Sequence, residues 1–209
     1  MIMAKEKRIV EKKDLLSANE YAKKRKQYRK ELLEFKKYRR VPIGPYATFY
    51  FESFETMLAQ IQEMLHIEKG GDAQLKDELE AYNPLIPQGK ELVTTLMFEI
   101  DNPISRIDFL GKVGGIEEKA YIQIDSEKIK ANPETDVDRT STEGKASSVQ
   151  FLHSSFKAFV RSTFINYLNI LLILPSSFMP VLRHLSNRHA GHFFLVCIDI
   201  GHCAPRRQT

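Results

Sequence analysis

The segment 39–87 constrains the fold more than any other part of this 209-residue chain. It contains ATFYF (47–51), which has the β-branched and aromatic composition of a strand. The next run, ETMLAQIQEMLHIE, has apolar residues at helical spacing and stops at a pair of glycines. A second short helix capped by Asp72 and the proline-bracketed loop NPLIPQG complete the segment. A strand followed by two helices in so short a stretch predicts an α+β domain.

A long basic helix precedes this segment. Ser17 and Glu20 have the spacing of a capping box, so the helix is predicted to begin near Ala18 and to end before Val41-Pro42. One face is apolar, and basic residues spread over the rest of the surface. The predicted buried face consists of Tyr21, Tyr28, Leu32 and Phe35.

The second half of the chain predicts mainly strands. Residues 91–100 and 148–156 have strand composition, and 120–125 alternates with period two before a hairpin into 128–130. A short helix after Asn102-Pro103 is predicted, with Ile107 and Leu110 facing inward, and Pro42 to Pro45 is predicted to be a turn. The predicted fold is therefore α+β, an antiparallel or mixed sheet with helices packed on one side, preceded by the long basic N-terminal helix.

The length is that of one domain. We expect a single α+β domain over residues 14–160, between a flexible basic N-terminus (1–13) and a divergent C-terminal segment (161–209). The two cysteines lie in the last thirteen residues, which excludes a disulfide scaffold, and no signal peptide precedes the first helix. A cytoplasmic location is expected. Residues 164–182 are apolar but interrupted by asparagines, serines and prolines, so a membrane segment is not favoured.

Charge is distributed unevenly along the chain. Residues 1–40 hold 15 Lys/Arg and 6 Asp/Glu, a net charge of +9, and the remaining residues therefore carry −5. Guanidinium groups in this region could clamp carboxylates or phosphates, which predicts an anion- or partner-binding role for Arg25, Arg29, Arg39 and Arg40. With Tyr28 and Tyr38 among them, they would also suit single-stranded nucleic acid. The alternative that we favour is pairing within the domain to Glu52, Glu55, Glu63, Glu78 and Glu80.

One pattern suggests a metal. Glu63 and His66 are three residues apart on a predicted helix, as in each Glu-x-x-His of a ferritin-like di-iron site. The second copy that such a site needs is missing from the sequence, so a surface pair is the simpler interpretation. His153, from a strand, could join them in a mixed imidazole and carboxylate site for iron or zinc. A second group of possible ligands lies in the tail, at His184, His189, His192, Cys197, His202 and Cys203.

Catalytic signatures are missing from the sequence. It contains no G-x-S-x-G elbow, and the glycines around Lys112 have the spacing of neither a phosphate-binding loop nor a dinucleotide fingerprint. A non-enzymatic protein is therefore the favoured interpretation.

Several long motifs between residues 14 and 156 carry a family resemblance. They are EYAKKRKQYRKELLEFKKYRRV, GPYATFYFES, ETMLAQIQEMLHIEKGG, ELEAYNPLIPQGKELVTTLMFEID, GGIEE and EGKASSVQFLH. The segment resembles an uncharacterised bacterial family catalogued as domain of unknown function family 3501. The resemblance stops after Phe156, so the tail is a divergent end, an insertion or a frameshifted reading.

The resemblance implies no established activity. Such proteins are often encoded beside rubrerythrin and an iron–sulfur oxidoreductase, which implies a link to peroxide or iron handling and oxidative stress. We therefore expect a cytoplasmic accessory protein that binds a protein partner through its charged helix. The alternatives are a metal-binding redox protein and a nucleic-acid-binding protein that uses the basic helix.

Overall fold

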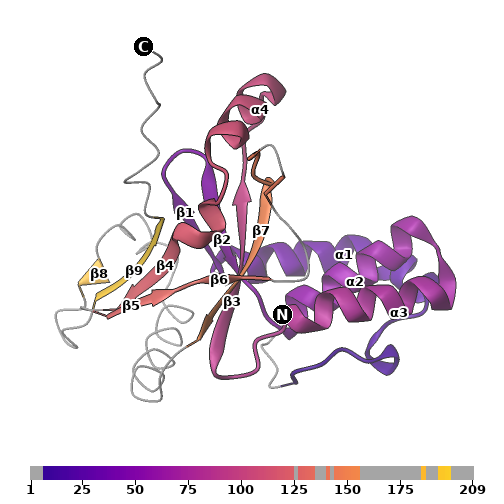
Figure 1. The fold of residues 1–209 in the computed structure, drawn as a ribbon. Coiled ribbons are helices and arrows are strands. Elements are labelled where there is room, and N and C mark those ends of the chain that lie inside the picture. Colours follow the sequence, from indigo (N-terminus) through magenta and orange to yellow (C-terminus); the bar gives the residue numbers. More distant parts are fainter. Residues whose placement is uncertain are drawn as a thin grey trace, which may run out of the picture. The chain divides into compact units, whose positions relative to one another are not determined.

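The structure is a computed structural model that describes residues 7–124, 127–134, 140–141, 144–155, 185–186 and 193–198 (Figure 1). Its contacts group the chain into two compact units. Unit 1 comprises residues up to Arg40 together with 51–93, and unit 2 comprises 41–50 together with the chain from Thr94. The boundary between them passes through the segment 14–160 that the sequence predicted as one domain.

Unit 1 is helical. Its helices are α1 (Ala18–Lys37), α2 (Phe54–Glu68) and α3 (Gly71–Tyr82), with short 3-10 turns at Lys12–Asp14 and Asn83–Leu85. α2 packs against both α1 and α3 (Figure 1). The predicted capping box of α1 is present, because Ser17 Oγ accepts from the Glu20 amide and the Glu20 carboxylate accepts from the Ser17 amide.

The link between α2 and α3 differs from the prediction. The residue that ends α2 in the left-handed conformation is Lys69, with φ of 57°. Gly71, with φ of 72°, opens α3 instead of closing α2, and the N-cap of α3 is Gly70. Asp72, the predicted cap, lies inside the first turn of α3 and pairs with Lys12. Here a lysine occupies the left-handed position at which a helix usually ends on glycine, and the glycine pair lies at the start of the next helix.

Strands β1 to β3 enter a five-stranded sheet in the order β1-β2-β3-β7-β6. Its strands are β1 (Arg40–Ile43), β2 (Ala47–Phe51), β3 (Glu91–Phe98), β7 (Val149–Ser155) and β6 (Asn132–Pro133). A second, four-stranded sheet has the order β5-β4-β9-β8. Its strands are β4 (Ala120–Ile124), β5 (Glu127–Lys130), β9 (Phe193–Ile198) and β8 (Leu185–Ser186).

The predicted α+β class is confirmed. The strand pairs β4–β5, β4–β9, β6–β7 and β8–β9 are all antiparallel. Residues 40–43 form a strand, although the sequence predicted a turn from Pro42. Proline lacks the amide that a central strand needs, and β1 accommodates it because this strand lies at the edge of its sheet.

Helix α4 (Pro103–Lys112) follows Asn102, as predicted, and the Asn102 side chain caps it by accepting from the Ile104 and Ser105 amides. Leu110 is buried, but Ile107 is 58% exposed, so its predicted inward position is wrong. The ring of Phe109 determines which side of the helix faces inward, since it packs 5.4 Å from the rings of both Tyr46 and Phe98. Ile107 points elsewhere as a consequence.

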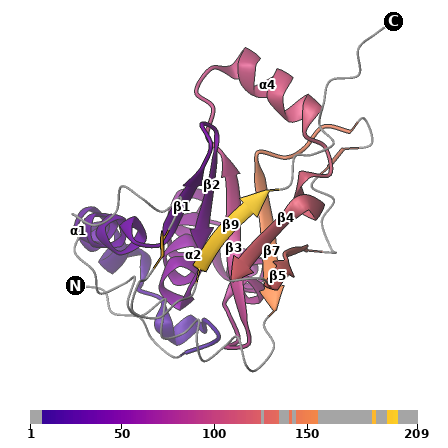
Figure 2. The same ribbon diagram turned by 90° about the vertical axis from the view of Figure 1, so that its left-hand side faces the viewer.

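The predicted hairpin between residues 120 and 130 is confirmed. Ile122 lies opposite Ile129, and both side chains are buried. The other edge of β4 pairs with β9, which lies beside it in Figure 2. β9 contains Cys197, but the five other possible ligands of the tail lie outside the described residues, as do residues 164–182. No helix within the described ranges combines the length and the apolar character that a membrane span needs.

Candidate functional site

Helix α1 presents two chemically different faces. Its inner face carries Tyr21, which is 1% exposed and packs edge-on to Tyr28 with 6.1 Å between ring centroids. Arg25 lies beside this face, one turn after Tyr21. Most of the other side chains of α1 are exposed. The inner face packs against α2, and the Glu63 carboxylate of α2 accepts a hydrogen bond from Arg25.

Glu63 of α2 holds this inner face. Its carboxylate accepts from the Tyr21 hydroxyl at 2.8 Å and from Arg25 Nε at 3.0 Å, and a second guanidinium nitrogen of Arg25 completes a bidentate pair. Arg29 lies 3.9 Å from the same carboxylate. A planar guanidinium matches a carboxylate in this geometry, so the contact fixes both the position and the orientation of α1.

The electrostatics agree with the contacts. The hydrogen bond from Arg25 is the main cause that lowers the pKa of Glu63 to about 2, and the hydrogen bond from Tyr21 adds to it. Burial and the neighbouring carboxylate raise the pKa of Tyr21. Both groups therefore keep a single protonation state near neutral pH, with Glu63 charged and Tyr21 neutral.

The three predicted metal ligands each have a different setting. Glu63 is bonded to Arg25 and Tyr21, and the His66 ring lies edge-on to Tyr21 at 5.5 Å between centroids. His153 is on β7, where it pairs in register with Asn132 of β6. Over the described ranges, no group of three or more His, Cys, Asp or Glu side chains is arranged to hold a metal ion. The iron or zinc site stays a prediction.

A second charged group lies where α1 ends and α2 begins. The Arg39 guanidinium stacks on the Phe35 ring at 4.9 Å, and its Nε is buried without a hydrogen-bond partner. Burial lowers the pKa of Arg39, and the carboxylates of Glu55 and Glu52 act in the opposite direction. Glu55 is 3% exposed and Glu52 is 8% exposed, so two carboxylates are buried near one cation. Such a group stabilises the fold only while its charges stay matched.

The four predicted anion-binding arginines thus have different settings. Arg25 is bonded to Glu63, and Arg39 is stacked on Phe35. Arg29 is more exposed and lies near Glu63, and Arg40 is exposed at the start of β1. Their role in anion or partner binding stays a prediction.

The outer face of α1 carries a row of lysines that we call the lysine stripe: Lys23, Lys26, Lys30 and Lys37. Spacings of three, four and seven residues place them on the side of the helix opposite Tyr21. All four are exposed, and within the described residues the stripe's one ion pair within 4.0 Å is Lys37 with Glu34, at 3.9 Å. Leu33 lies along the edge of the stripe and is 69% exposed. The stripe extends over about 21 Å at 1.5 Å per residue.

Two amide side chains have a role that the sequence did not reveal. Gln62 accepts from the Leu16 amide at 2.7 Å and donates to the Leu16 carbonyl at 3.2 Å. Asn83 binds Val10 in the same way, at 2.8 and 3.1 Å. Residues 7–17 are therefore tied to unit 1, although 7–13 belong to the N-terminus that was predicted to be flexible. A polar residue at a helical position predicts exposure, so only the burial of Gln62 identifies this role.

Comparison with known proteins gives a consistent result. The model of a family described as "Protein of unknown function (DUF3501)" matches residues 9–176. The chain is also similar to a crystal structure of a novel protein of unknown function from Burkholderia pseudomallei K96243, determined at 1.90 Å. That similarity has a TM-score of 0.70 and 34% sequence identity, and it covers 75% of this chain and 82% of the other. No protein in the curated collection matches.

Proposed function

The chain belongs to the DUF3501 family of proteins of unknown function, and we propose that it is a non-enzymatic binding protein that docks an acidic protein partner through the lysine stripe of α1. The observation that carries the proposal is the separation of charges on this helix. The inner cations are bonded to carboxylates of the same chain, whereas the outer ammonium groups are exposed to solvent. Exposed cations in a row attract an acidic surface and steer its approach.

The chemistry of the stripe favours a protein over a nucleic acid. Tyr28 packs against Tyr21 and is half-buried, so its ring is committed inside unit 1 and is a poor platform for a base. Leu33 exposes apolar surface directly beside the lysines. A protein partner can bury that leucine at the centre of a contact ringed by ion pairs, whereas a phosphate backbone offers it nothing.

The partner that we propose belongs to a rubrerythrin-type peroxide or iron redox system. This finer step is supported by the resemblance of the chain to proteins encoded beside rubrerythrin and an iron–sulfur oxidoreductase. The lysine stripe supplies the cations that an acidic face on such a partner would meet. In this proposal the role of the chain is to position or recruit the partner.

The test uses a rubrerythrin from the same genome and two matched variants. Lys26→Glu with Lys30→Glu reverses two charges on the stripe, and Lys76→Glu with Lys90→Glu makes the same change at exposed lysines elsewhere in unit 1. We expect calorimetry at low salt to show that the wild type and the control both bind rubrerythrin. The stripe variant should bind more weakly, with a Kd about tenfold or more higher. Binding should also weaken as salt is added.

The contrary results separate the two parts of the proposal. If rubrerythrin and the neighbouring iron–sulfur oxidoreductase both fail to bind the wild type, the redox partner is wrong. If one of them binds and the stripe variant binds as tightly as the control, the docking surface is wrong. Circular dichroism of both variants confirms that neither change unfolds the helix.

A further inference from the structure

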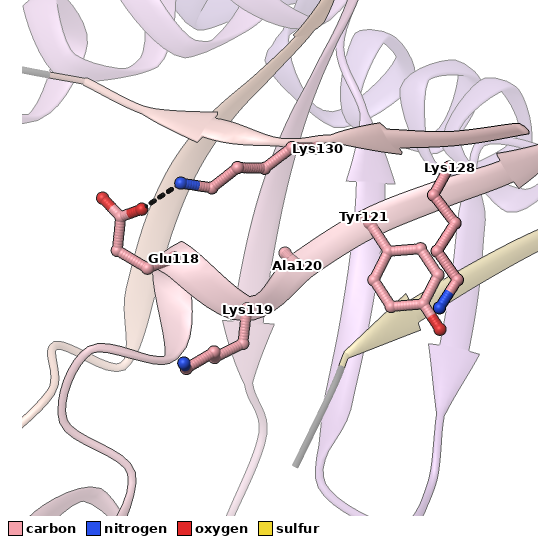
Figure 3. Close-up of a pocket in the computed structure, with 6 residues that line it drawn as sticks. All are labelled: Glu118, Lys119, Ala120, Tyr121, Lys128 and Lys130. Atoms are coloured by element: carbon pink, nitrogen blue, oxygen red, sulfur yellow. Dashed lines mark hydrogen bonds and ion pairs between the residues drawn. The ribbon is translucent and has the colours of Figure 1, made fainter. Parts of the chain in front are cut away.

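A shallow pocket of about 250 Å³ lies on the β4–β5 hairpin in unit 2 (Figure 3). The end of the 3-10 turn Ile116–Lys119 forms one side of it, and the outward faces of β4 and β5 form the rest. Its lining consists of Glu118, Lys119, Ala120, Tyr121, Lys128 and Lys130. Three lysines and one glutamate give this lining a net charge of +2.

The hairpin register explains why these side chains share one face. Tyr121 lies opposite Lys130, and Lys128 is two residues from Lys130 on the same strand. Successive side chains of a strand point to opposite faces, so Lys128, Lys130 and Tyr121 project away from the buried pair Ile122 and Ile129. Strand pairing therefore places Lys128 and Lys130 on one face, and Lys119 comes from the 3-10 turn that precedes β4.

Each ammonium group in the pocket has a different partner. Lys130 forms an ion pair with Glu118, the residue of the lining that carries a charge of opposite sign (Figure 3). Lys128 Nζ lies 4.7 Å from the centre of the Tyr121 ring, a cation–π contact that orients the ammonium group but leaves its charge uncompensated. Lys119 is exposed and forms no ion pair within the described residues. Two of the three cations therefore lack a carboxylate there.

We propose that this pocket binds a small oxyanion, a phosphate group being the chemical class that fits best. Lysine ammonium groups bind phosphate as compact point charges with freely rotating donors, and the volume suits a phosphate or diphosphate better than a larger ligand. Lys119 and Lys128 supply the charge, and the Tyr121 ring positions Lys128. The proposal is independent of the docking surface on α1, because none of its residues belongs to unit 1.

The test is a titration of the full chain with inorganic phosphate and with pyrophosphate at low salt. Binding is measured from amide chemical shifts or by calorimetry. We expect the wild type to bind phosphate saturably. In the double variant Lys119→Ala with Lys128→Ala, the Kd should be at least about tenfold higher. Lys76→Ala with Lys90→Ala, which removes the same charge elsewhere, should bind like the wild type. Equal weakening in both variants would mean non-specific attraction to net charge and would overturn the site, as would the absence of saturable binding.

A second pair of variants tests the role of the ring. Tyr121→Phe keeps the aromatic face under Lys128, whereas Tyr121→Leu removes it and keeps an apolar side chain. We expect the phenylalanine variant to retain phosphate binding and the leucine variant to bind several-fold more weakly. If both bind like the wild type, Tyr121 does not position Lys128. The α1 variant Lys26→Glu with Lys30→Glu should retain phosphate binding, so failure of one proposal is distinguishable from failure of the other.

Discussion

The α1–α2 helix pair and the β4–β5 hairpin are both rich in charge, but they use it differently. In the helix pair, Arg25 and Arg39 lie near partly or fully buried carboxylates from the next helix. On the hairpin and the 3-10 turn that leads into it, Lys128 and Lys119 are exposed and meet no carboxylate within the described residues. The comparison teaches that a count of charges does not locate function. Whether a carboxylate of the same chain meets a cation decides whether that cation stabilises the fold or is available for a ligand.

The largest effect is expected at Arg39. Arg39→Met should lower the free energy of unfolding by about 3 kcal/mol, because it removes a cation that interacts electrostatically with the buried carboxylates of Glu55 and Glu52. Chemical denaturation checks this, with Arg40→Met as the control, since Arg40 is the adjacent and exposed arginine. Equal stability of the two variants would mean that the buried charges are not coupled.

Glu63 should contribute about 2 kcal/mol to the free energy of unfolding, and this contribution should depend on pH. The figure is smaller than the full pKa shift would give, because the carboxylate is partly exposed and solvent screens it. Its pKa lies at about 2 in the folded chain against an ordinary value of 4.5, so its carboxylate stabilises the fold above pH 4.5. That contribution is lost as the pH falls from 4.5 toward 2. Unfolding measured across this range should show a smaller loss in Glu63→Gln than in the wild type, and Glu80→Gln should behave like the wild type.

Replacement of Gln62 should have a smaller effect on the free energy of unfolding. Gln62→Ala leaves the Leu16 amide and carbonyl without their partner, which should cost about 1 to 2 kcal/mol. Gln60→Ala, two residues earlier on the same helix, removes one long hydrogen bond of 3.4 Å to Tyr82 and should cost less than about 0.5 kcal/mol. Urea denaturation of the two variants would contradict the role of Gln62 if their midpoints coincide.

The hairpin should show the smallest effects on stability. Lys130→Ala breaks an exposed ion pair with Glu118 and should change the free energy of unfolding by less than about 1 kcal/mol. Lys119→Ala with Lys128→Ala should change it by about 0.5 kcal/mol or less, because neither side chain belongs to the core. A loss as large as that expected for Arg39→Met would show that these lysines are part of the fold and would remove the contrast between the two regions.

Local patterns in the sequence predicted most of the elements. The capping box at Ser17, the hairpin between 120 and 130 and the helix after Asn102-Pro103 are confirmed because each depends on neighbours in sequence. The failures depend on contacts between distant residues. Ile107 is exposed because Phe109 packs on Tyr46 and Phe98, and β1 was missed because an edge position tolerates its proline.

The candidate site was predictable to a smaller extent. Helical periodicity identified the inner face of α1, and the sequence suggested pairing of its arginines with Glu63 among several acidic residues. A charged or polar residue at a helical position predicts exposure, yet Glu55 and Gln62 of α2 are both buried. A charged residue is buried only when its partner is supplied by another segment, so Glu55 could not be distinguished from an exposed glutamate without the position of Arg39. The hairpin pocket likewise depends on strand register.

The most direct test of the contrast between engaged and available cations is lysine acetylation followed by mass spectrometry, with and without the rubrerythrin-type partner. We predict that the partner protects Lys23, Lys26, Lys30 and Lys37 from acetylation and leaves Lys119 and Lys128 as reactive as in the free chain. Adding pyrophosphate should give the reverse pattern. Partner protection of Lys119 and Lys128 with the stripe fully reactive would contradict the docking surface on α1.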